Sequence, residues 1–142
     1  MNEFTAVIEE LIRLFKDLSQ VEEKKLEAAK KNRITHVEAC MNQEQAAILR
    51  LRGLEKRLEA SQEELGCGKC TFRQILDKAS GTEDYSRLKM LFDTLSHQVR
   101  QFKSISDSAR TMIDINLHVL NKTLNTPRQG AVNEKSKWEG LL

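Results

Sequence analysis

Apolar residues recur three or four positions apart along most of the chain, which is the period of one face of an α-helix. In the first 30 residues this face consists of Phe4, Val7, Ile8, Leu11, Leu14, Phe15, Leu18, Leu26 and Ala29. In the second segment the same spacing links Val37, Met41, Ile48, Leu51, Leu54 and Leu58. The pattern predicts two long helices of about 29 residues each.

A tight turn is expected between these helices, at the sequence NRITHVEA. Asn32 tolerates the left-handed backbone conformation that commonly ends a helix. Thr35, followed three residues later by Glu38, matches a capping box, in which each side chain accepts a hydrogen bond from an unpaired backbone N–H group. One continuous helix through this segment is the alternative.

The glycine-containing segment LGCGKC is expected to end the second helix. Thr71 and Gln74 form a second capping-box pattern just after it. The pattern predicts a short helix over about residues 72–79, which stops near Gly81.

The last helix is predicted to be the longest, over about residues 83–124, with Thr82 as its N-cap. Its apolar stripe alternates four and three positions through Leu88, Phe92, Leu95, Val99, Phe102, Ser106, Ala109, Ile113, Asn116 and Leu120. Pro127 disfavours helical backbone at the residue before it, so the helix should end there.

These elements predict an all-α fold: an elongated antiparallel bundle of three long helices plus one short helix, with a polar C-terminal tail. We expect residues 1–125 to form the bundle domain and residues 126–142 to form a flexible tail.

The last predicted helix is longer than the two long helices that it packs against. At about 1.5 Å per residue it would reach roughly 63 Å, against roughly 44 Å for each of the first two. If all three start level, residues 111–124 have no neighbour within the chain, and an exposed apolar stripe of this kind marks an interaction site. The predicted partner-binding residues are Met112, Ile113, Asn116, Leu117, Leu120 and Leu124. A staggered or bent bundle, which would cover this stripe itself, is the alternative, and Trp138, Leu141 and Leu142 are candidates to shield it.

Composition narrows the possible partners. The chain has 23 Lys and Arg against 21 Asp and Glu, so it lacks the strong positive field that attracts nucleic acid or anionic lipid. No apolar run approaches the roughly 20 residues needed to span a bilayer, and the N-terminal sequence does not look like a signal peptide. A cytoplasmic protein with no membrane insertion is expected.

The CxxC pair Cys67 and Cys70 is the main candidate for chemistry. A structural zinc site needs four ligands, and His36 and Cys40 lie at the far end of a helix roughly 45 Å long. A redox CxxC usually follows a strand, and none is predicted here. Three cysteines are also an odd number for a disulfide framework. We therefore expect a plain turn in which the two thiols are small space-filling side chains. Metal binding through an oligomer and redox chemistry are the alternatives. We expect no catalytic residues, no metal and no cofactor.

The order of parts resembles the FlgN family of flagellar export chaperones over about residues 4–125. The similar features are the paired helices LIRLFKDLSQVEEKKLEAAKKNRITHVEACMNQEQAAILRLRGLEKRL, the turn LGCGKC, the short helix TFRQIL and a long helix that closes with SARTMIDINLHVLNKTLN.

The resemblance implies a cytoplasmic type III export chaperone. Such a protein binds the C-terminal helical segments of hook–filament junction proteins through its last helix, prevents their premature assembly and delivers them to the export gate. Gate contact in the family can use a late aromatic residue, and this sequence has none between Phe102 and Trp138. The alternative is a self-associating coiled-coil structural or adaptor protein, with a possible homodimer.

Overall fold

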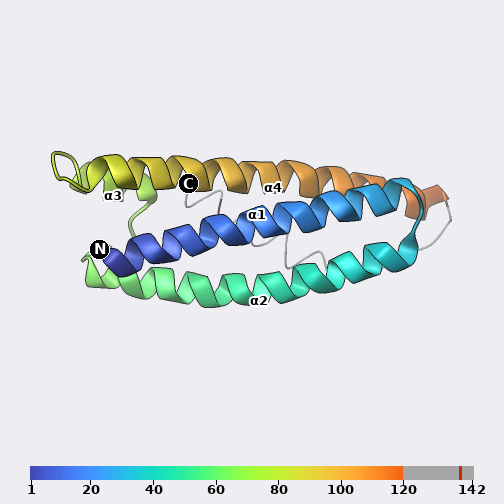
Figure 1. Cartoon of the computed structure of the whole chain (residues 1–142), viewed down its shortest axis with the longest axis horizontal. Coiled ribbons are helices and arrows are strands. Elements are labelled where there is room, and N and C mark those ends of the chain that lie inside the picture. Colours follow the sequence, from blue (N-terminus) through green and yellow to red (C-terminus); the bar gives the residue numbers. More distant parts are fainter. Residues whose placement is uncertain (120–137, 139–142) are drawn as a thin grey trace.

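The structure is a computed structural model that describes residues 1–119 and Trp138. The first 119 residues form four helices, α1 (Asn2–Lys30), α2 (Ile34–Glu64), α3 (Phe72–Lys78) and α4 (Tyr85–Val119). The three long helices lie side by side, with α1 between α2 and α4, and α3 packs on α4 (Figure 1). The predicted all-α antiparallel bundle is confirmed: α2 runs against α1, and α4 runs parallel to α1.

The central position of α1 follows from its wide apolar face, which must be covered on two sides. The predicted residues from Phe4 to Leu18 are all buried. They pack in one cluster with Leu51, Leu54, Leu58, Phe72, Ile75, Leu88, Phe92, Leu95, Val99 and Phe102. The first part of α2 contributes little to this cluster, because its buried apolar residues become frequent only after Ile48.

The turn between α1 and α2 is a Schellman motif centred on Asn32. This residue has the predicted left-handed conformation, with φ of 53°. The Asn32 and Arg33 N–H groups donate to the Ala29 and Ala28 carbonyls, which lack partners within the helix. The predicted capping box at Thr35 and Glu38 is wrong: Arg33 is the N-cap, without a side-chain cap, because the compact turn allows α2 to begin at Ile34.

The C-terminus of α2 closes in the same way. Gly66 has φ of 72°, and its N–H donates to the Glu63 carbonyl, while the Cys67 N–H donates to the Gln62 carbonyl. Only glycine adopts this backbone conformation without steric cost, so the prediction that the glycine segment ends the helix is confirmed.

The predicted capping box at the start of α3 is also confirmed. The Gln74 N–H donates to the Thr71 hydroxyl, and the Thr71 N–H donates to the Gln74 side-chain carbonyl. Phe72 then stacks on Phe92 of α4, with ring centroids 4.5 Å apart. The predicted cap of α4 is wrong: the Thr82 hydroxyl donates back to the Ala79 carbonyl, so it extends the preceding turn, and α4 begins only at Tyr85.

Candidate partner-binding surface

The alignment of α1 with α4 determines which part of α4 has a neighbour. Phe4 contacts Phe92 and Phe15 contacts Phe102, with ring centroids 5.9 and 5.8 Å apart. Both pairs are 87 or 88 positions apart in the sequence, as are Asn116 and Ala29, which are hydrogen-bonded. This offset places the end of α1 level with about residue 117 of α4. The helices are staggered, so any unpaired stretch begins about 117 rather than at the expected residue 111.

The six predicted partner-binding residues differ in their surroundings. Ile113 is buried, with 6% of its surface exposed, and Met112 is half-buried. Asn116 donates its side-chain N–H to the carbonyl of Ala29, near the C-terminus of α1. Leu117 belongs to α4, but its side chain lies outside the described residues, as do Leu120 and Leu124. The expectation that this stretch lacks neighbours in the chain is therefore wrong at Ile113 and Asn116, whereas partner binding stays a prediction.

A different face of the same helix is open. Ile115 is 50% exposed, and Met112 and Ile105 are half-buried. These residues are seven and three positions apart, so they form one stripe on α4, which we call the outer seam. Ile115 is not among the residues predicted from the sequence, because the predicted stripe is mainly the one that faces α1. Apolar residues at spacings of three and seven are the pattern that a second amphipathic helix recognises.

A basic pocket lies at the hairpin end of the molecule, where α1 passes into α2. Its volume is about 350 Å³. It is lined by Lys24, Glu27, Ala28, Lys31, Arg33, His36, Ala39, Cys40 and Gln43. Three fixed cationic groups face one carboxylate, so this hairpin pocket favours acidic partner groups. Ala28 lines the pocket, and its neighbour Ala29 is hydrogen-bonded to Asn116 of α4. The pocket therefore lies near the same end of α4 as Ile115.

A charged cluster is buried between α1 and α2. The Lys25 ammonium lies 2.7 Å from a Glu44 carboxylate oxygen and 3.0 Å from a Glu22 oxygen. Burial raises the pKa of the Glu22 carboxyl to about 8, with further contributions from its hydrogen bond with Glu44 and from the charge of Glu44. Glu22 is therefore mostly protonated at neutral pH, which leaves one carboxylate to balance one ammonium.

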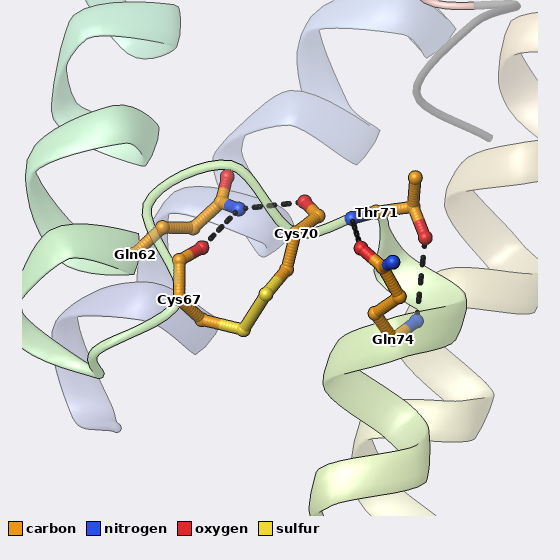
Figure 2. The surroundings of a disulfide bond; sticks show 5 residues. All are labelled: Gln62, Cys67, Cys70, Thr71 and Gln74. Carbon is orange, nitrogen blue, oxygen red and sulfur yellow. Dashed lines mark hydrogen bonds between the residues drawn. A yellow bond between two sulfur atoms is a disulfide. The ribbon is translucent and has the colours of Figure 1, made fainter.

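The CxxC pair is bonded as a disulfide (Figure 2). The Gln62 side-chain amide donates to the carbonyls of both Cys67 and Cys70, at 3.2 and 3.0 Å, and so holds the turn between them closed. The Cα atoms of the two cysteines are 5.2 Å apart, within the range that a disulfide requires. The expectation of two unbonded thiols is wrong, because the Schellman turn and Gln62 bring together residues whose spacing alone does not imply a bond.

Trp138 lies in the hydrophobic core, although it belongs to the segment that we expected to form a tail. Its indole meets Phe15 edge-on, with ring centroids 5.4 Å apart, and 1% of its surface is exposed. Phe15 is level with Phe102 on α4, about three helical turns from Ile113. The idea that Trp138 shields the stretch after residue 111 is therefore wrong. Leu141 and Leu142 lie outside the described residues.

Two observations on the described residues concern metal binding and thiol chemistry. In residues 1–119 and Trp138, no group of three or more His, Cys, Asp or Glu side chains is placed to hold a metal ion. His36 and Cys40 share the hairpin pocket, as their spacing suggested, but burial raises the pKa of the Cys40 thiol and so disfavours the thiolate that would bind a metal or attack a substrate. A stretch able to span a bilayer is absent from the helices that the structure describes.

A family model described as FlgN protein matches residues 1–136. The chain belongs to the FlgN family. A search of curated proteins and a search of solved structures each returned no match.

FlgN proteins are a family of chaperones rather than of enzymes, and membership indicates a flagellar export chaperone that binds flagellar export substrates. A chaperone of this type needs a surface for another polypeptide rather than a set of catalytic groups. The outer seam and the hairpin pocket, which lie near the same end of the molecule, are described features that suit this task.

Proposed function

We propose that this FlgN protein is a cytoplasmic chaperone for hook–filament junction proteins. It binds their C-terminal helical segments, prevents their premature assembly and delivers them to the type III export gate. The observation that carries this proposal is the outer seam: an apolar stripe on α4 that includes a half-exposed isoleucine and leads to the point where α1 ends.

The binding site that we propose combines two sets of residues. The first set is the outer seam of Ile105, Met112 and Ile115. The second set comprises the residues proposed from the sequence, which are Met112, Ile113, Asn116, Leu117, Leu120 and Leu124. An amphipathic cargo helix lying along α4 would cover the seam and then continue past the end of α1.

The chemistry of the cargo follows from these surroundings. The seam requires apolar residues at helical spacing, and the hairpin pocket favours an acidic residue at the end of the cargo helix that lies nearest the hairpin. An interface of roughly 1,600 Å², formed while the cargo becomes ordered, would bind tightly enough for protection and weakly enough for release.

Delivery requires a second contact, with an export-gate component. Trp138 is the candidate for this contact, since it is the one aromatic residue after Phe102. Its indole is buried, so a gate contact would require it to leave the core.

Capture of a purified junction-protein C-terminal segment tests the cargo site. The wild type should retain the segment, and the double variant Leu117→Asp, Leu120→Asp should lose it. The matched control is Met90→Asp, because Met90 is 69% exposed on the same helix but near its opposite end. Equal capture by the double variant would refute the site.

Self-association is the alternative, and a second measurement on the same proteins tests it. Light scattering of the wild type and of both variants measures the molar mass without cargo. A tight dimer that the double variant abolishes, together with no cargo capture, would identify a self-associating adaptor instead.

A further inference from the structure

The disulfide turn and Trp138 share one part of the structure. Gly68, Lys69 and Cys70 of the turn border a cavity of about 160 Å³ together with Trp138 itself. Helix α2 supplies the remaining lining residues, which are Glu55, Leu58, Glu59 and Gln62. With Phe15 beneath the indole, these residues form what we call the indole seat. The turn is therefore one wall of the seat.

Trp138 is buried in this seat, but the hydrogen-bonding capacity of its indole is not satisfied there. Its Nε1–H group has no hydrogen-bond partner within the part of the chain that the structure describes. An unpaired buried donor destabilises the docked state, and the indole borders a cavity rather than being enclosed on every side by the described residues. The docked indole should therefore respond to a small displacement of any wall.

The disulfide is one of the restraints on the position of the turn. The bond fixes Cys67 to Cys70, and the Gln62 side chain adds hydrogen bonds to their carbonyls. Once the bond is broken, the two sulfur atoms must move apart to non-bonded contact. The turn then retains the hydrogen bonds of Gln62 and the backbone hydrogen bond from the Cys70 N–H group to the Cys67 carbonyl. The turn contains Gly68 and follows Gly66, so its backbone can accommodate that change.

We propose that the CGKC turn is a redox-sensitive latch that holds Trp138 in the indole seat. The disulfide form keeps the indole docked, and the dithiol form releases it into solvent. The co-reactant is a dithiol reductant, either a small molecule or a protein of the dithiol oxidoreductase class.

Reduction proceeds by thiol–disulfide exchange. A thiolate of the reductant attacks the Cys70 sulfur, since Cys70 is half-buried whereas Cys67 is 4% exposed. The S–S bond breaks, Cys67 leaves as a thiolate and takes a proton, and a mixed disulfide forms. The second thiol of the reductant then displaces Cys70, which also becomes a thiol. Two electrons and two protons have moved to the protein, and the reductant leaves as a disulfide.

The chain provides its own reporter, because Trp138 is its single tryptophan. The experiment uses the full chain and measures the emission maximum of Trp138 and its quenching by acrylamide. Both are compared between the oxidised protein and the protein treated with dithiothreitol, with thiol titration to verify the state of the turn. The isolated tail peptide, residues 126–142, gives the values for a fully exposed indole.

We expect reduction to shift the emission to the red and raise the quenching constant toward the values of the tail peptide, while helicity by circular dichroism is unchanged. The double variant Cys67→Ser, Cys70→Ser should have the emission maximum and quenching constant of the reduced protein, and dithiothreitol should not change them. The matched control is Cys40→Ser, which removes the one cysteine outside the turn and should respond as the wild type does.

Three results would overturn the latch. The first is identical emission and quenching in the oxidised, reduced and double-variant proteins. The second is a loss of helicity that accompanies the change in fluorescence, since the bond would then stabilise the whole bundle rather than hold one side chain. The third is the presence of free Cys67 and Cys70 thiols after equilibration with oxidised glutathione. None of these results depends on cargo binding, so they leave the proposed chaperone function open to its own test.

Discussion

Replacing Glu22 with glutamine should change how the stability of the bundle depends on pH. Glu22 is fully buried beside Lys25 and Glu44, and its pKa rises from 4.5 to about 8 on folding. Between these two values the folded protein binds more protons than the unfolded chain, so the free energy of unfolding falls as pH rises. Glutamine has a similar shape and stays neutral, and therefore removes this contribution.

The size of the effect follows from the pH range that lies between the unfolded and folded pKa values of Glu22. One pKa unit corresponds to about 1.4 kcal/mol, so raising the pH from about 5.5 to about 7.5 should cost the wild type roughly 2 kcal/mol through this group. The Glu22→Gln variant should be close to the wild type in stability at the lower pH and more stable by roughly 2 kcal/mol at the higher pH.

Urea unfolding followed by circular dichroism at several pH values measures this difference. Glu23→Gln is the matched control, because Glu23 is the exposed neighbour of Glu22 and its replacement should leave the pH profile unchanged. Parallel stability profiles for the wild type and Glu22→Gln would refute the assignment of a protonated Glu22 to the folded state.

Three further substitutions test the packing and the turns, each by urea unfolding. Leu95→Ala should destabilise the bundle by about 2–5 kcal/mol, because Leu95 is fully buried between α4 and α1; a cost below about 1 kcal/mol would contradict this packing. Asn116→Ala should cost about 1 kcal/mol by removing the side-chain donor to Ala29, and an unchanged stability would show that this bond contributes nothing. Gly66→Ala should cost about 1 kcal/mol, because alanine is strained at φ of 72°, whereas Gly53→Ala, in the interior of α2, should not destabilise the protein.

The sequence predicted the local features well. Helical periodicity located the helices, and Asn32, Gly66 and the pair Thr71 and Gln74 act as predicted. Each of these features depends on interactions within a few residues, which a sequence pattern records directly. Thr82 and the pair Thr35 and Glu38 have the same kind of pattern, but the predictions were wrong. The Thr82 hydroxyl donates to the preceding Ala79 carbonyl, and α2 already begins at Ile34, before Thr35.

Features that depend on contacts between distant residues were not predictable. The stagger of α1 and α4 follows from which aromatic residues pair across the core, and periodicity does not specify that pairing. The Glu22, Lys25 and Glu44 cluster joins residues from two helices that look polar in the sequence. The docking of Trp138 and the exposure of Ile115 likewise depend on how the helices pack.

We propose that cargo binds along the outer seam of α4. The most direct test is titration calorimetry with a junction-protein C-terminal segment, comparing Met112→Asp, Ile115→Asp with the control Leu49→Asp, Met90→Asp. The control residues are more than 65% exposed and lie away from the seam. The seam variant should bind at least about tenfold more weakly than the wild type, while the control should bind as the wild type does. Equal affinity of the seam variant and the wild type, with both proteins fully helical, would contradict it.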